Sequence, residues 1–150
     1  MFLKYQIKTW FKYLFLAVFG GGLYYFIELT WRGKSHWTMF VLGGIVFVYA
    51  GIQNEYTEWD TPFIKQLFHT ECFTLLAEFL TGCVVNLWLK WDVWDYSNLP
   101  GNLLGQTSWQ FALLFLPLCA VAIFLDDYLR YWFFGEEFPK YHLLKGGHDE

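Results

Sequence analysis

The sequence predicts an all-α integral membrane protein, a single helical domain over residues 1–150 that crosses a membrane about four times. Of its 150 residues, 56% are hydrophobic and 16% are charged, which is too apolar for an ordinary soluble domain of this length. Runs almost free of charge recur along the chain, each close to the roughly 17–25 residues that cross a hydrocarbon core. A tryptophan-rich loop separates the last two runs. The predicted helices cover residues 11–29, 36–53, 70–89 and 108–130, and an interfacial or cytoplasmic tail covers residues 131–150.

Glycines distinguish the first two predicted helices. The first helix carries Gly20, Gly21 and Gly22 near its middle. The second carries Gly43, Gly44 and Gly51. Small residues let helix backbones approach closely within lipid. A bundle of four helices leaves little room for a solute pathway within a single chain, so we expect a homo-oligomer or a partner subunit. The glycine-rich faces are the predicted contacts.

Lysine and arginine residues predict the orientation of the chain. Seven of them precede the first helix, lie between the second and third, or follow the fourth, and three lie at the other ends of the helices. The positive-inside rule therefore places both termini in the cytoplasm of a cell (inner) membrane and the tryptophan-rich loop outside. The seven are Lys4, Lys8, Lys12, Lys65, Arg130, Lys140 and Lys145; the three are Arg32, Lys34 and Lys90.

An acidic residue lies in the middle of the third predicted helix. Glu78 shares one helical face with four other residues, at intervals of three or four residues. They are Glu71, Leu75, Gly82 and Asn86. An ionised carboxylate is costly inside a membrane, so Glu78 should face protein and not lipid. One interpretation is a neutral Glu78 that hydrogen-bonds another helix. The other is a site for a ligand, an ion or a proton.

At the outer end of the first helix, Glu28 precedes Arg32 by four residues. Acid before base at this spacing is the favourable order for a salt bridge. The same outer side carries the tryptophan-rich loop, so both residues are candidates for a binding site there.

The loop between the third and fourth helices contains a predicted turn at residues 99–102, where Pro100 and Gly101 occupy the central positions of a type II turn. Its aromatic residues fit interfacial anchors. Alternatively, they form a lid that encloses a cationic or ring-bearing solute, with Asp92 and Asp95 supplying charge. The aromatic set is Trp88, Trp91, Trp94, Tyr96 and Trp109, and Asn98 and Asn102 are further candidate ligand residues.

After the fourth apolar run, the segment DDYLRYWFFGEEFPKY mixes acids, a base and aromatic rings. A helix that continues to the headgroups and stops at Gly135 and Pro139 explains it. A docking surface for a cytoplasmic partner is the alternative.

Several function classes lack the required residues. The net charge of −4 does not fit a nucleic-acid partner. The chain has no phosphate-binding G-x-x-x-x-G-K-[ST] loop, and no G-x-S-x-G elbow. We expect no cofactor, no metal and no hydrolytic activity, because the histidines are scattered and the cysteines have no C-x-x-C spacing. These residues are His36, His69, His142 and His148, and Cys72, Cys83 and Cys119.

The segment EFLTGCVVNLWLKWDVWDYSNLPGNLLGQTS, followed by an apolar run and LDDYLRYWFFGEEFPKY, resembles the bacterial putative ABC-transporter type IV (CmpB-like) family. The resemblance is strongest over residues 54–141. The combination W-D-Y-S, then P-x-N and G, is its most specific part. It implies a small multi-helix membrane protein with a transport role and a possible ATPase partner. No catalytic residue is carried over. The matching residues are Trp94, Asp95, Tyr96, Ser97, Pro100, Asn102, Gly105, Glu78, Gly82, Asn86 and Glu28.

The predicted function is a permease-type subunit that handles a small solute, energised by a separate ATPase or an ion gradient. A structural or assembly protein, an oligomeric channel and a lipid-headgroup enzyme using Glu28, Asp92 and Asp95 stay as alternatives. The candidate ligand-binding residues are Glu28, Arg32, Glu78, Asn86, Trp94, Asp95, Tyr96, Asn98 and Asn102.

Overall fold

The computed structural model describes residues 2–57 and 61–144, with the backbone alone for residues 2–7. Its main elements are helices α1 (Phe2–Arg32), α2 (Trp37–Tyr56), α3 (Phe63–Gly82) and α4 (Trp109–Phe134). Within the described residues, four helical stretches are long and apolar enough to cross a membrane: Lys8–Arg32, Trp37–Tyr56, Phe63–Trp88 and Trp109–Phe134. The chain is therefore an all-α, multi-pass membrane protein, as the sequence predicts.

The ends of the first, third and fourth helices differ from the predicted ranges. α1 begins at Phe2 and ends at Arg32, and so extends beyond residues 11–29 at both ends. α3 begins at Phe63, where the carbonyl of Pro62 accepts from the N–H groups of Lys65 and Gln66. Among the polar residues of its first turns, Gln66 and Thr70 are buried, whereas Lys65 and His69 are exposed. α4 continues to Phe134 and ends at Gly135, whose φ of 67° is the left-handed conformation that glycine adopts at helix ends.

Two elements were not predicted from the sequence. A short π-helical segment, η1 (Cys83–Trp88), continues α3. In the loop that follows, β1 (Asn102–Leu103) pairs antiparallel with β2 (Thr107–Ser108). Ser108 also accepts a hydrogen bond from the N–H of Phe111 and so caps the start of α4.

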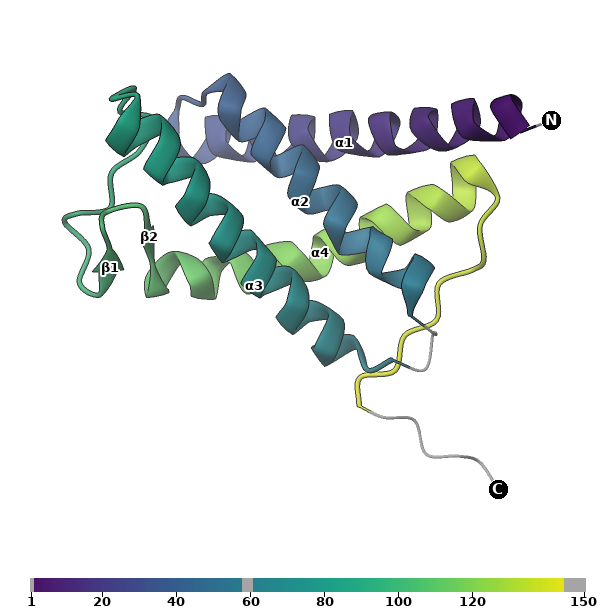
Figure 1. The fold of residues 1–150 in the computed structure, drawn as a ribbon. Helices are drawn as coiled ribbons and strands as arrows, with labels where there is room; N and C mark the ends of the chain where they lie inside the picture. The colour runs from purple at the N-terminus through teal and green to yellow at the C-terminus, as the bar shows by residue number, and fades with distance from the viewer. Residues whose placement is uncertain (1, 58–60, 145–150) are drawn as a thin grey trace.

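The helices alternate in direction (Figure 1), which brings distant segments together at each end of the bundle. At what we call the terminal end, Lys12 of α1 reaches Glu55 of α2 at 2.7 Å and Glu136 after α4 at 2.6 Å. At the loop end, Arg32 of α1 donates to the carbonyl of Val93 at 2.8 Å. Which end faces the cytoplasm stays a prediction, and the Lys4 side chain and Lys145 that entered it lie outside the described residues.

The glycines of α1 and α2 pack these two helices against each other. A Cβ at Gly20 would lie 2.2 Å from Cβ of Phe47, and one at Gly44 would lie 2.6 Å from the carbonyl oxygen of Ala17. Close helix contact was predicted, but its assignment to a second subunit was wrong for these positions. The glycines are used within the chain because any side chain there would push α1 and α2 apart.

Candidate functional site

All four long helices line a cavity of about 90 Å³ inside the bundle. Its walls are mainly apolar and include the rings of Tyr24, Phe47 and Phe115. Among the described residues that line it, Glu78 is the charged one. A concave apolar site with one convergent polar group is the usual form of a small-ligand pocket. Glu78 therefore defines the candidate site.

Glu78 is held by two hydroxyl groups from the loop. Thr107 donates to Oε2 at 2.9 Å, and Tyr96 donates to Oε1 at 3.3 Å. Burial and the neighbouring Glu78 raise the pKa of Tyr96, so its phenol stays a donor. The Glu78 side chain is 1% exposed. It faces protein, as the sequence predicts.

No lysine or arginine nitrogen in the described part of the chain lies within 4 Å of the Glu78 carboxyl group. Arg32 pairs with Glu28 and not with Glu78, at a distance of 2.8 Å from Nη1 to Oε1 of Glu28. The hydroxyl of Ser35 donates to the other carboxyl oxygen of Glu28 at 2.5 Å. The predicted Glu28–Arg32 salt bridge is therefore confirmed. Glu78 is left buried with neutral donors only.

Asn86 and Trp94 do not line the cavity. Asn86 accepts from the N–H of Val93 at 2.7 Å and donates to Gln106 at 2.8 Å, while the indole of Trp94 donates to the carbonyl of Gln106 at 2.9 Å. Gly82 packs against the side chain of Gln106, because a Cβ added at Gly82 would lie only 2.6 Å from Oε1 of Gln106. These residues fasten the loop to the end of α3. Trp94 therefore belongs to the core, whereas the sequence offers it either as an interfacial anchor or as part of an aromatic lid.

The remaining loop candidates shape the turn. Asp95 is exposed and accepts from the hydroxyl and the N–H of Ser97, and these hydrogen bonds lower the pKa of Asp95. Asn102 donates to the carbonyl of Leu99 at 2.7 Å and accepts from the N–H of Gly105 at 2.8 Å. Asn98 is exposed. Thus Glu28, Arg32, Tyr96 and Glu78 come together, whereas Asp95, Asn98 and Asn102 lie apart from the cavity.

A second polar group at the cavity lining was not predicted from the sequence. Cys119 of α4 lies 3.5 Å from the hydroxyl of Thr74, and its thiol donates to Glu71 at 3.4 Å. Cys119 and Thr74 line the cavity. The sequence predicted only packing for Cys119, since a helix face cannot be assigned within a uniformly apolar run.

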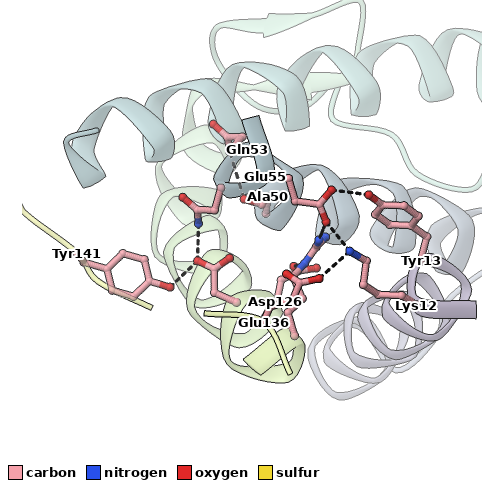
Figure 2. Close-up of polar contacts among 11 residues, drawn as sticks. Lys12, Tyr13, Ala50, Gln53, Glu55, Asp126, Glu136 and Tyr141 are labelled. Atoms are coloured by element: carbon pink, nitrogen blue, oxygen red, sulfur yellow. Dashed lines mark hydrogen bonds and ion pairs between the residues drawn. The ribbon is translucent and has the colours of Figure 1, made fainter. Parts of the chain in front are cut away.

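A second polar cluster lies at the terminal end and was also missed (Figure 2). Arg130 bridges Asp126 and Glu55, and Lys12 bridges Glu55 and Glu136. Asp127 accepts from Asn54 and from Tyr141, each at 2.5 Å. The spacing of four residues between Asp126 and Arg130 was a usable signal. The sequence predicts a helix that carries both residues out to the headgroups, and the structure adds that both side chains are buried within the protein.

In the described part of the chain, no three His, Cys, Asp or Glu side chains are grouped so that they could hold a metal ion.

Neither a curated protein nor a solved structure is detectably similar to the chain. The family described as "Putative ABC-transporter type IV" matches residues 4–136, which include all four long helices and the loop. The chain therefore belongs to this putative ABC-transporter type IV family and is a transporter-like membrane protein.

Proposed function

We propose that the protein is a permease-type subunit that binds a small organic cation in the four-helix cavity, with Glu78 supplying the countercharge. One observation supports this assignment above others. Glu78 is buried, lines a cavity and has neutral hydrogen-bond donors as its only partners among the described residues. A buried carboxyl group in this state carries a proton or takes up a cation from outside.

The cavity walls favour an ammonium group over a metal ion. The rings of Tyr24, Phe47 and Phe115 offer π faces, to which alkylammonium groups are attracted. The apolar remainder suits short alkyl substituents. A volume of about 90 Å³ corresponds to about three water-sized groups. The proposed solute class is therefore a small alkylammonium ion.

Exchange of a proton for the solute gives a simple binding cycle. An empty site holds the proton on Glu78, where Tyr96 and Thr107 orient the carboxyl group. As the ammonium ion enters, the Glu78 proton leaves to water, so that one positive charge replaces another and the buried carboxylate stays neutralised. The paired Glu28–Arg32 group near the loop end leaves Glu78 as the uncompensated acid.

Saturation-transfer NMR with ethylammonium tests the proposal on the full-length chain in lipid nanodiscs, with ethanol as the neutral comparison. We expect transfer to ethylammonium only, and its loss in Glu78→Gln. Glu71→Gln is the matched control, since Glu71 is a buried acid of α3 outside the cavity lining. Equal transfer in wild type and Glu78→Gln would overturn the assignment. So would loss in both variants.

The energy source is a further part of the proposal. The chain lacks a phosphate-binding loop, so ATP-driven transport needs a separate ATPase subunit. Native mass spectrometry of gently extracted protein tests this directly. An ATPase bound to the chain is the expected result. A symmetric homo-oligomer that carries only lipid would instead favour the channel or assembly alternatives.

A further inference from the structure

A second cavity, of about 350 Å³, lies at the terminal end between α2, α4 and the segment after α4. Residues of α2 and α4 line both this cavity and the central cavity. On α2, Phe47 lines the central cavity and Gly51, one turn later, lines the second. On α4, Ala122 lines the first and Asp127 the second. The two cavities therefore lie at successive levels along α2 and α4.

The carboxyl group of Asp127 repeats the arrangement of Glu78. Asp127 is 3% exposed and lines its cavity. It accepts from the amide of Asn54 and the hydroxyl of Tyr141. Burial and Asp127 raise the pKa of Tyr141, which keeps the phenol a donor. Among the described residues, no lysine or arginine nitrogen lies within 4 Å of Asp127.

The cavity lining is strongly acidic. Four carboxyl groups line it against one guanidinium group, that of Arg130. Arg130 is already paired with Asp126 and Glu55, and Lys12 pairs with Glu55 and Glu136. Among the described residues, Asp127 takes part in none of these ion pairs. A ligand for this cavity should therefore carry positive charge. The four acids are Glu55, Asp127, Glu136 and Glu137.

Two buried polar atoms of the lining indicate that a ligand needs hydrogen-bonding groups as well as a positive charge. Arg130 is 2% exposed, and its Nη2 donor has no hydrogen-bond partner among the residues that the structure describes. In the same part of the chain, Asn54 Oδ1 is a buried acceptor without a partner. Both residues line the cavity. Unpaired buried polar atoms are costly, so a ligand that pairs with them gains affinity. Nη2 requires an acceptor, and Asn54 Oδ1 and Asp127 require a donor or a cation.

We propose that the terminal-end cavity is a second binding site, for an ammonium solute that also carries an oxygen acceptor, such as an amino alcohol. The ammonium group lies against Asp127 and Asn54 Oδ1, and the oxygen accepts from Nη2 of Arg130. This proposal rests on the proposed function and extends it, because organic ammonium ions would then have one binding site in the central cavity and another in the terminal-end cavity. It does not depend on Glu78 for its own contacts.

Calorimetric titration of choline into the full-length chain in lipid nanodiscs tests the second site. The Glu78→Gln variant removes the central site and should still bind choline. Adding Asp127→Asn should weaken this binding about tenfold or more, the effect of losing a charged partner. Asp95→Asn, an exposed acid at the loop end, is the matched control and should change nothing. Unchanged choline affinity on Asp127→Asn would overturn the second site.

Probe chemistry tests the oxygen and the charge separately. Tetramethylammonium, which lacks the hydroxyl group, should bind about two- to tenfold more weakly than choline. The uncharged 3,3-dimethylbutan-1-ol should not bind. Equal affinity for all three would contradict the assignment. Glu136→Gln, at a half-buried lining residue outside the helices, should weaken choline binding about two- to fivefold and serves if Asp127→Asn fails to fold.

The two proposals fail in different ways. If ethylammonium binds at Glu78 but choline does not bind to Glu78→Gln, the second site is wrong and the proposed function stands. If choline binding depends on Asp127 while ethylammonium binding is indifferent to Glu78, the proposed function is wrong and the second site stands.

Discussion

The hydroxyl group of Tyr96 donates to Oε1 of Glu78 over 3.3 Å, so a loop residue holds a carboxyl group buried in α3. The ring of Tyr96 also stacks on Phe111 of α4, with ring centroids 4.2 Å apart. The loop, α3 and α4 therefore meet at the wall of the central cavity. A substitution in the loop, α3 or α4 at this contact should therefore change the position or the hydrogen bonding of the Glu78 carboxyl group.

Tyr96→Phe should reduce stability by about 1–2 kcal/mol, because it removes one of two donors to a buried carboxyl group while keeping the ring stack. Thermal unfolding in nanodiscs, followed by tryptophan fluorescence, measures the effect. Tyr56→Phe is the control, since Tyr56 is 81% exposed. Equal melting temperatures for the two variants would contradict the role given to Tyr96.

Gly51→Ala should be destabilising by about 1–3 kcal/mol through overpacking. A Cβ at Gly51 would lie 1.6 Å from Oδ1 of Asp126, so Asp126 must move and its ion pair with Arg130 must break. Gly22→Ala is the matched helical control, because its Cβ would lie an ordinary 3.8 Å from Phe40. A Gly51→Ala protein as stable as Gly22→Ala would show that the contact is dispensable.

Asn86→Ala should release the loop from α3. It leaves the N–H of Val93 and Oε1 of Gln106 without partners, at a cost of about 1–3 kcal/mol. Faster amide hydrogen exchange over residues 91–107 is the expected signature. Asn98→Ala, at an exposed position of the same loop, should leave exchange at the wild-type rate. Identical exchange in both variants would count against the docking role.

The turn at Asp95 should loosen in acid. Hydrogen bonds from Ser97 lower the pKa of Asp95, so its ionised form favours the folded turn. This contribution is present above the ordinary aspartate pKa of about 3.9 and is lost as the pH falls through the lower folded value. Carbon-detected NMR of the carboxyl group should show a titration midpoint below about 3.9. In Ser97→Ala the midpoint should move up towards that value; no movement would exclude Ser97 as the cause.

The sequence predicts much of this fold because membrane spans depend on length and apolar composition, which need no tertiary information. Burial of Glu78 and the Glu28–Arg32 pair follow from helical spacing alone. Both are local properties of one helix. The family was predicted from the resemblance of the loop and its flanking segments, and the match over residues 4–136 confirms the family.

The parts that could not be predicted depend on contacts between helices. Gly20 and Gly44 indicate close packing, but their spacing does not say whether the neighbour is the same chain or another. Trp94 has the composition of an interfacial anchor, yet Asn86 and Gln106 draw it into the core. The Asp127 cavity needs Asn54, Tyr141 and Arg130 from separated segments. No pattern in one segment predicts such a site.

Infrared difference spectroscopy of the Glu78 carboxyl group tests the central claim most directly. Ethylammonium added to the full-length chain in nanodiscs should remove the carbonyl stretch of a protonated carboxyl group and produce a carboxylate band. The change should be absent in Glu78→Gln and present in Glu71→Gln. If ethylammonium leaves the carbonyl stretch unchanged in the wild-type protein, or if the change persists in Glu78→Gln, Glu78 does not carry the countercharge of the solute.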